Sequence, residues 1–250
     1  MKHRSQPILI IALLASLITA CSSAPQKSPL PPVPAAATAP SILSHITDPK
    51  TSRLRLYWKD DTGKIIGSLG ALKSYESSHH RTLRFAMNGG MYKEDRAPLG
   101  LYMEQGKRLA TLNKDTGFGN FYMKPNGIFY LTKNKAAVII PTEDFRPSAD
   151  IQFATQSGPM LLINGRMHPR FVAGSKNLNL RNGVGILPDG RVLFAISRAP
   201  VSFYDFAAFF QNKGCRNALY LDGFVSRCYL PEENFVQTDG SFGVIIGEVK

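Results

Sequence analysis

The residue types best suited to chemistry in this chain are polar side chains that stand directly beside glycines. Asp222 supplies a carboxyl group that can act as acid, base or nucleophile, and Arg181 supplies a planar cation suited to phosphate. Glycine lets the backbone approach a ligand closely, but such pairs are also ordinary turn sequences, so each one alone is better explained as a turn. The complete set is Asn88-Gly89-Gly90, Ser157-Gly158, Arg181-Asn182-Gly183, Asp222-Gly223 and the nearby Ser226.

The standard catalytic signatures are absent from the sequence. It contains no Gly-x-Ser-x-Gly nucleophile turn, no His-Glu-x-x-His zinc motif and no glycine-rich phosphate loop ending in Lys-Ser or Lys-Thr. His79 and His80 are adjacent, and neighbouring residues on a strand point to opposite faces, so we interpret both as surface histidines. The sequence therefore predicts no metal site and no cofactor, and it carries no nucleic-acid-binding motif.

The elements that must position Asp222 and Arg181 are strands, because strand-like segments dominate the sequence. The segment 217–221 predicts a strand that ends at Asp222, and the end of a buried strand is a rigid place for a reactive side chain. Pro188-Asp189-Gly190 predicts a hairpin turn between the strands 183–187 and 191–197. The other predicted strands are 53–58, 83–87, 99–104, 120–124, 127–132, 136–140, 151–155 and 159–163.

One helix is predicted, and it follows Ser202. That serine can cap the N-terminus of the helix, with Asp205 three residues later as in a capping box. The spacing i, i+3, i+4, i+7 of a buried helix face is shared by Phe203, Phe206, Ala207 and Phe210. Many strands with few helices predict a single α+β domain with a mixed, mostly antiparallel sheet.

The first 50 residues are interpreted as an export signal and a tether. Residues 1–20 combine a basic start with an apolar run that is too short for a comfortable membrane span, as in a signal peptide. Cys21, directly after Ile-Thr-Ala, resembles the acylated cysteine of bacterial lipoproteins; the alternative is an ordinary secretory signal with an unrelated cysteine. Residues 21–50, rich in proline and alanine, predict a tether, and residues 51–250 the folded domain. We expect lipidation at Cys21 and anchoring in the cell envelope, at the periplasmic face of the outer membrane.

Charge and cysteine content bear on the partners of the domain. Residues 51–250 carry about +9 of the net charge of +12. This surplus favours an anionic partner such as a phosphate-bearing substrate, an acidic glycan or a membrane surface, although solubility alone explains it equally well. Cys215 and Cys228 flank Asp222, and they either form a disulfide in an oxidising compartment or remain two buried thiols.

Taken together, the glycine-adjacent motifs resemble the phosphodiester glycosidase family, which includes the lysosomal enzyme that removes N-acetylglucosamine to uncover mannose 6-phosphate. The resemblance rests on the order Asn-Gly-Gly, Ser-Gly-Pro, Arg-Asn-Gly, Leu-Asp-Gly and Ser across about residues 80–247. The resemblance is greatest to a bacterial branch of exported proteins, and there it rests on the segments 85–92, 124–127 and 203–207. The family implies hydrolysis of a sugar-1-phosphodiester at the anomeric carbon, so a carbohydrate phosphodiester is the expected substrate.

The resemblance also implies a role for each motif residue. Asp222 would act at the sugar carbon, Arg181 would hold the phosphate through paired hydrogen bonds, and Asn88 would complete the catalytic set by holding a sugar hydroxyl. The substrate-binding residues that the family pattern implies are Gly89, Gly90, Ser157, Gly158, Asn182, Gly223 and Ser226.

Two features of the sequence leave the activity open. Glycosidases usually use two carboxylates, and the candidates for the second are Glu94, Asp95 and Asp205, of which Asp205 is better explained as a helix cap. Phe224 stands where the uncovering enzyme has a second glycine, so its N-acetylglucosamine specificity is not expected to carry over. The hypotheses are therefore an envelope phosphodiester glycosidase, a lipoprotein that binds an anionic glycan without turnover, and a structural envelope adaptor.

Overall fold

Residues 42–250 are described by a computed structural model of the chain. The predicted signal peptide, Cys21 and residues 22–41 of the predicted tether lie outside the described residues. The predicted domain boundary at residue 51 is wrong, because residues 42–47 form a strand of the largest sheet, with Leu43 and Thr47 buried. The sequence pattern does not predict this strand, because a proline-rich segment precedes it and because buried and exposed residues do not alternate regularly along it.

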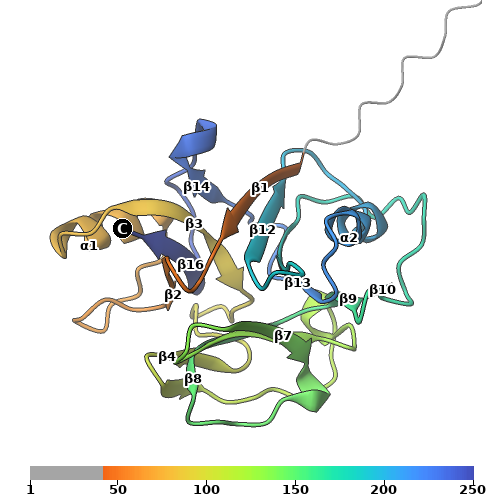
Figure 1. Cartoon of the computed structure of the whole chain (residues 1–250), viewed down its shortest axis with the longest axis horizontal. Coiled ribbons are helices and arrows are strands. Elements are labelled where there is room, and N and C mark those ends of the chain that lie inside the picture. Colours follow the sequence, from red (N-terminus) through yellow and green to blue (C-terminus); the bar gives the residue numbers. More distant parts are fainter. Residues whose placement is uncertain (1–41) are drawn as a thin grey trace, which may run out of the picture. The chain divides into compact units, whose positions relative to one another are not determined.

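The largest sheet has six antiparallel strands in the order β1-β12-β11-β13-β9-β10, so segments that are distant in the sequence lie side by side (Figure 1). Strand β13 is an interior strand, pairing with β11 on one side and with β9 on the other. The six strands are β1 (Ile42–Thr47), β9 (Met160–Ile163), β10 (Arg166–Met167), β11 (Asn182–Ile186), β12 (Val192–Ser197) and β13 (Ala218–Tyr220).

Helix α2 (Phe203–Asn212) packs on this sheet. Phe206 and Phe210 are fully buried in one apolar cluster with residues of β9, β12 and β13, as the sequence pattern predicted. The predicted cap is also confirmed: Ser202 Oγ accepts a hydrogen bond from the Asp205 N–H at 3.0 Å and donates one to the Asp205 carboxylate at 2.6 Å. The helix therefore begins where its sequence signal placed it.

A second sheet has five antiparallel strands in the order β15-β14-β3-β16-β2, and helix α1 (Leu69–Ser78) packs on it. Leu69 and Leu72 of this helix are fully buried in a cluster with residues of the sheet such as Ile245. The sequence pattern did not predict α1, because only these two leucines and Glu76 are buried along it. The strands are β2 (Arg53–Tyr57), β3 (Leu83–Gly90), β14 (Cys228–Leu230), β15 (Phe235–Val236) and β16 (Val244–Val249).

A third antiparallel sheet has the order β5-β4-β8-β6-β7. Its strands are β4 (Tyr102–Glu104), β5 (Lys107–Ala110), β6 (Gly127–Thr132), β7 (Ala137–Pro141) and β8 (Ile151–Ser157). Short 3-10 helices are η1 (Asn120–Tyr122), η2 (Thr142–Asp144) and η3 (Pro231–Glu233). The predicted strand 120–124 is therefore wrong: the segment turns, and Asn126 Nδ2 holds the turn by donating to the carbonyl of Phe121 at 2.9 Å.

One apolar core joins the three sheets. Phe194 of β12 packs on Phe85 of β3, with ring centroids 5.0 Å apart, and on Phe129 of β6 at 6.1 Å. The predicted α+β class with few helices and antiparallel sheets is confirmed. In residues 42–250 neither helix has the length and apolarity needed to span a membrane.

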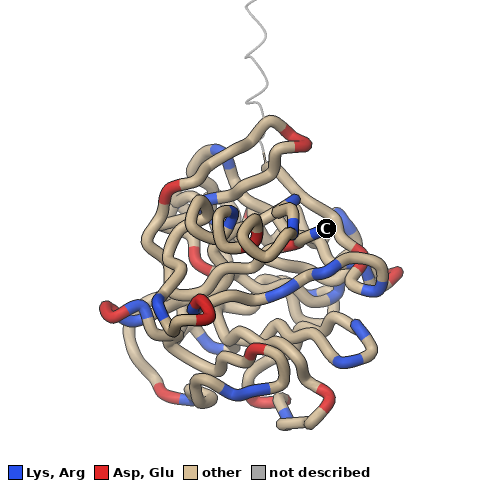
Figure 2. Tube along the Cα trace, turned by 90° about the vertical axis from the view of Figure 1, so that its left-hand side faces the viewer, with Lys and Arg blue, Asp and Glu red and all other residues tan. Residues whose placement is uncertain are grey.

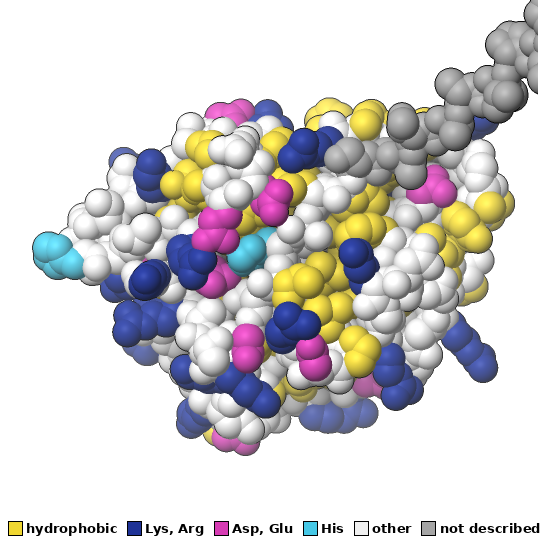
Figure 3. All heavy atoms as spheres, turned by 45° about the horizontal axis from the view of Figure 1, so that its top comes forward, with side chains coloured by type: hydrophobic (Ala, Val, Ile, Leu, Met, Phe, Trp, Pro, Cys, Tyr) yellow, Lys and Arg dark blue, Asp and Glu magenta, His cyan; other side chains and the backbone are white. Residues whose placement is uncertain are grey.

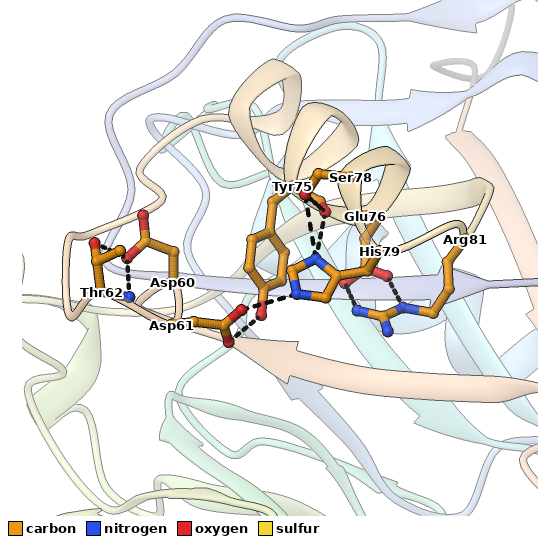
Figure 4. Close-up of polar contacts among 8 residues, drawn as sticks. All are labelled: Asp60, Asp61, Thr62, Tyr75, Glu76, Ser78, His79 and Arg81. Atoms are coloured by element: carbon orange, nitrogen blue, oxygen red, sulfur yellow. Dashed lines mark hydrogen bonds and ion pairs between the residues drawn. The ribbon is translucent and has the colours of Figure 1, made fainter.

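The C-terminal end of α1 carries a partly exposed polar cluster (Figure 4). His79 Nε2 lies 2.8 Å from the Asp61 carboxylate, His79 Nδ1 lies 2.8 Å from the carbonyl of Tyr75, and Tyr75 Oη donates to Asp61 at 2.9 Å. Because a carbonyl and a carboxylate only accept, both ring nitrogens donate and the imidazole is held as its cation. The hydrogen bonds to Tyr75 and Asp61 accordingly raise the pKa of His79.

Candidate functional site

The strand ends that carry the motif residues meet around Asp222, and each of the three sheets contributes one or more of them. Asp222 follows β13, and Asn182 begins β11, the neighbour of β13 in the largest sheet. Asn88 lies near the end of β3 in the second sheet, and Ser157 ends β8 in the third. The tertiary structure thus gathers polar residues that are scattered over the sequence.

The gathered side chains form hydrogen bonds with the backbone N–H and carbonyl groups of Asp222 and with the carbonyl group of the residue before it. Asn182 Oδ1 accepts the Asp222 N–H at 2.8 Å, while Asn88 Nδ2 and Ser226 Oγ donate to the Asp222 carbonyl at 2.8 and 2.9 Å. Ser157 Oγ donates to the carbonyl of the preceding residue. All four side chains belong to buried residues. We call Asn88, Ser157, Asn182 and Ser226 the Asp222 clamp.

The Asp222 clamp is also bonded internally. Asn182 Nδ2 donates to the carbonyl of Asn88 at 2.8 Å and to its Oδ1 at 3.1 Å, and Asn88 Oδ1 accepts the Arg227 N–H at 3.0 Å. Both amide groups are therefore satisfied by protein partners at both ends. The clamp residues therefore hold the backbone around Asp222, and the substrate contacts that the family pattern implied for them stay a prediction.

The motif glycines permit close packing of protein on protein. A Cβ atom on Gly89 would collide with the side chain of Ile246, and one on Gly223 would collide with the Tyr220 hydroxyl and the Leu180 carbonyl. Added Cβ atoms at Gly90 and Gly158 would meet protein atoms equally closely. Internal packing therefore explains the four glycines that the family pattern assigned to substrate binding.

The side chain of Asp222 is partly buried. Burial raises the pKa of Asp222 to about 7. Burial, and to a smaller extent the charge of Asp222, also raises the pKa of Tyr92, and the pKa of Tyr220 rises to about 12 with the same two contributions. In Tyr220 the charge of Arg181 opposes this rise of the pKa. A carboxyl group with a pKa near 7 is populated in both states at neutral pH, as an acid or base requires.

Arg181 is a fully buried cation that pairs with no carboxylate among residues 42–250. Its Nε donates to the carbonyl of Val201 at 2.8 Å and its Nη2 to the carbonyl of Asn177 at 2.9 Å. Its guanidinium carbon lies 3.5 Å from the ring centroid of Phe203 and 5.7 Å from that of Tyr220. Burial lowers the pKa of this guanidinium, and the nearby Tyr220 partly offsets that effect.

The fold brings Arg181 and Asp222 into one region, with Tyr220 influenced by the charges of both. The Nε and Nη2 atoms of Arg181 are held by backbone carbonyls, and its role as a phosphate clamp stays a prediction. A buried guanidinium without a carboxylate partner leaves uncompensated positive charge next to Tyr220.

No second carboxyl group accompanies Asp222 in the described part of the chain. Glu94 is exposed, Asp95 is exposed and accepts the Ala97 N–H at 2.9 Å in a turn, and Asp205 serves as the cap of α2. The pKa of Asp222 is raised by burial and by no neighbouring acid. Nor do residues 42–250 contain three or more His, Cys, Asp or Glu side chains grouped to hold a metal ion.

The disulfide between Cys215 and Cys228 is not formed, so that alternative is corrected to two free thiols. Cys215 packs in the apolar cluster of α2, whereas Cys228 packs in the core that joins the three sheets. Burial raises the pKa of the Cys215 thiol to about 11 and that of Cys228 to about 12. Both therefore act as small apolar core residues.

Sequence reasoning missed the two tyrosines beside Asp222. Tyr220 ends β13 and Asp222 follows two residues later, and side chains two apart share one face where a strand continues. Tyr92 closes the motif Asn88-Gly89-Gly90-Met91-Tyr92, where only the asparagine and glycines were given a role. The period-two rule would have found Tyr220, whereas the approach of Tyr92 depends on the fold.

Two solved structures have a similar fold. The catalytic domain of zebrafish N-acetylglucosamine-1-phosphodiester alpha-N-acetylglucosaminidase, auto-inhibited by its pro-peptide, matches with a TM-score of 0.58 at 14% identity, over 85% of this chain and 84% of that one. A putative exported protein of Burkholderia pseudomallei K96243 matches with a TM-score of 0.55 at 10% identity, over 83% and 73% of the two chains. The described domain therefore shares its α+β fold with these two proteins.

Comparison at the sequence level assigns the family. The family model described as phosphodiester glycosidase matches residues 81–242. A protein of Escherichia coli strain K12, named uncharacterized protein YigE, is 40% identical over 191 residues, which span 76% of this chain and 74% of that protein. The chain belongs to the phosphodiester glycosidase family, so the resemblance predicted from its motifs is confirmed.

Proposed function

We propose that this protein is an exported, membrane-anchored hydrolase that cleaves sugar-1-phosphodiester bonds in envelope glycans or their precursors. Family membership supports the reaction class. The observation that carries the proposal is the environment of Asp222. Its pKa is raised to about 7, and its backbone is held on both sides by buried side chains. A carboxyl group with a pKa near neutral pH, carried on a firmly held backbone, is suited to proton transfer.

In the proposed reaction, water replaces a phosphate at the anomeric carbon. The bond from that carbon to the phosphate oxygen breaks, a bond to the water oxygen forms, and the products are a free sugar and a phosphate monoester. A phosphate is already a good leaving group and needs little protonation, so the proposed reaction uses one carboxyl group. We assign Asp222 the role of base, which takes the proton of the attacking water.

Arg181 and Tyr220 support this step without forming bonds to the sugar. The uncompensated charge of Arg181 favours the negative charge that develops on the departing phosphate. Tyr220 lies against both the guanidinium and the backbone of Gly223, directly after Asp222. Both are therefore positioning residues.

The test uses the purified full chain and a panel of sugar-1-phosphodiesters, with and without a chelator. The unmodified protein is expected to turn over at least one of them, and Asp222→Asn is expected to abolish turnover while leaving the fold intact. Asp189→Asn removes an exposed carboxylate in a hairpin turn and serves as the matched control. Equal turnover by Asp222→Asn and Asp189→Asn would refute the assignment of Asp222.

The anchoring part of the proposal rests on Cys21, which follows the apolar run of residues 8–18 and the small residues Thr19 and Ala20. Acylation with several chains at one cysteine gives stable membrane attachment. Cys21→Ser is expected to move the protein from the membrane to the soluble exported fraction. If the variant stays on the membrane and is processed as before, the anchor is not at Cys21.

The absence of a second carboxyl group beside Asp222 in residues 42–250 favours one alternative, a lipoprotein that binds an anionic glycan without turnover. The same assay separates the two functions. Binding of a sugar-1-phosphodiester in calorimetry without hydrolysis by the unmodified protein would establish the binding function and exclude the hydrolase.

A further inference from the structure

A strongly basic cleft of about 500 Å³ lies on the domain where edge strand β2 meets the third sheet. Its polar lining includes Arg53 and Arg55 of β2, Lys133 and Lys135 of the turn between β6 and β7, and the side chains of Gln105 and Gln152. No aspartate or glutamate lines the cleft. The four cations form no ion pair with a carboxylate in residues 42–250.

Unpaired positive charge is not general on this surface, as a neighbouring cavity of about 530 Å³ shows. There Arg84 pairs with Glu232 and His45 lies 2.7 Å from Glu248, so positive groups are balanced by acids. Charges of both signs are interspersed along the trace in Figure 2, and both signs occur on the face drawn in Figure 3. The basic cleft therefore concentrates positive charge in a concave place, which strengthens its attraction for anions.

The basic cleft is separate from the Asp222 site. Strand β6 pairs with β8 so that Gly127 faces Ser157 at one end and Thr132 faces Ile151 at the other. Ser157 belongs to the Asp222 clamp, whereas Thr132 and the neighbouring Lys133 line the cleft. The strand between Ser157 and Gln152 spans about 17 Å at roughly 3.3 Å per residue. The two sites therefore lie at opposite ends of the same strands.

We propose that the basic cleft binds a phosphate-bearing ligand, independently of chemistry at Asp222. Two arginines offer planar forks for phosphate oxygens, and two lysines add positive charge, of which Lys135 also donates to the carbonyl of Lys50 at 3.1 Å. Gln105 and Gln152 supply neutral hydrogen-bonding groups for the remainder of the ligand. A volume of about 500 Å³ lies within the usual range of small-ligand sites and accommodates a phosphorylated sugar or a lipid headgroup.

Calorimetry on the full chain carrying Cys21→Ser, with glucose 1-phosphate and inorganic phosphate as probes, tests the proposal. Arg55→Gln with Lys133→Gln is the cleft pair, and Lys64→Gln with Lys213→Gln removes the same charge from exposed positions that do not line the cleft. We expect the cleft pair to weaken binding about tenfold or more, because charge-assisted hydrogen bonds are lost. The control pair should change affinity less than about twofold.

Backbone amide shifts of the labelled protein locate the ligand. Shifts at Gln105, Lys133 and Gln152 are expected on titration with glucose 1-phosphate, and the same shifts should appear in Asp222→Asn. Binding that persists in Asp222→Asn separates this proposal from the proposed hydrolase. Shifts confined to the surroundings of Asp222 would overturn it, and so would equal weakening by the cleft and control pairs.

Vesicles of phosphatidylcholine, with or without phosphatidylglycerol, identify the source of the phosphate. Binding of glucose 1-phosphate without cosedimentation assigns a soluble phosphorylated sugar. Cosedimentation that needs phosphatidylglycerol and is lost in the cleft pair assigns a lipid headgroup. If neither the soluble probes nor the vesicles bind in a way that depends on the cleft pair, the cleft has no phosphate ligand and the proposal fails.

Discussion

Two aspartates of this domain are both held by hydrogen bonds, yet their pKa values are shifted in opposite directions. Asp61 accepts hydrogen bonds on its carboxylate from Tyr75 and His79, and these bonds lower its pKa. Asp222 is held by its backbone, while burial of its carboxyl group raises its pKa to about 7. Donors on the carboxylate favour the ionised form, whereas burial without donors disfavours it.

The comparison shows how the fold prepares one of these aspartates for chemistry. Hydrogen bonds fix the backbone of Asp222 without stabilising the charge of its carboxylate, so the pKa of the carboxyl group stays near neutral pH. The Asp61 cluster near the end of α1 is more exposed, and it ties the helix to the loop before it (Figure 4). Such a cluster contributes to local stability and leaves its carboxylate a weak base.

The largest expected effect follows replacement of Asp222. Asp222→Asn keeps the shape of the side chain but removes the titrating group, and loss of a general acid or base typically lowers the rate by about 10²–10⁴-fold. In the unmodified protein, turnover should rise with pH through about 7, because the base must be ionised. The measurement is the dependence of kcat on pH. Turnover that falls across this range would assign Asp222 as the acid instead.

The same substitution should stabilise the domain. The folded-state pKa of Asp222 is raised to about 7, so the folded state loses stability as the pH rises from about 4 to about 7, while Asn does not titrate. The stability advantage of Asp222→Asn should therefore grow across this pH range. It should reach at most about 4 kcal/mol, and contact of the carboxyl group with solvent lowers that value. Thermal melts at pH 4 and pH 8 measure it. An advantage that does not grow with pH would contradict the burial of the carboxyl group.

Arg181→Lys should reduce stability by about 2–4 kcal/mol, because one ammonium cannot serve both carbonyls that the guanidinium holds. Urea unfolding at pH 7 measures this loss. The change should also weaken turnover, and its effect should be non-additive with Asp222→Asn if both residues serve one transition state. Additive effects on kcat would separate Arg181 from the Asp222 site.

Asn182→Ala tests the Asp222 clamp. The substitution leaves the Asp222 N–H and a carbonyl of β3 without their partners, which should cost about 1–3 kcal/mol and lower kcat. Asn212→Ala, at the exposed end of α2, is the matched control and should be nearly neutral. Normal kcat in stable Asn182→Ala would show that the clamp does not position the carboxyl group.

The smallest effect is expected in the exposed cluster. Folding raises the pKa of His79, so the protonated imidazole stabilises the folded state. This contribution is complete when the pH is below the pKa of His79 in the unfolded chain, and it is lost as the pH rises through the pKa in the folded state. The lowered pKa of Asp61 means that its contribution is lost as the pH falls through the folded value. His79→Gln should therefore lower the Tm slightly at pH 5.5 and not at pH 9. An equal change at both values would show that the charge of His79 is not involved.

The sequence by itself determined the α+β class, most of the strands, helix α2 with its cap and the family, because these depend on local periodicity, capping residues and motif order. It also singled out the residues that gather around Asp222. Only the tertiary structure decided what those residues do. Amides that were read as ligand contacts face the Asp222 backbone, and Arg181 is held by carbonyls.

The same physical reason accounts for the other differences. A side chain's role depends on what lies opposite it, and strands from three different sheets meet at this site, which local patterns do not encode. Helix α1 escaped prediction since few of its residues are buried, and Cys215 and Cys228, close in sequence, lie in separate apolar clusters. The raised pKa of Asp222 likewise results from burial. The sequence therefore identified this carboxyl group as a candidate, whereas the fold determines its pKa.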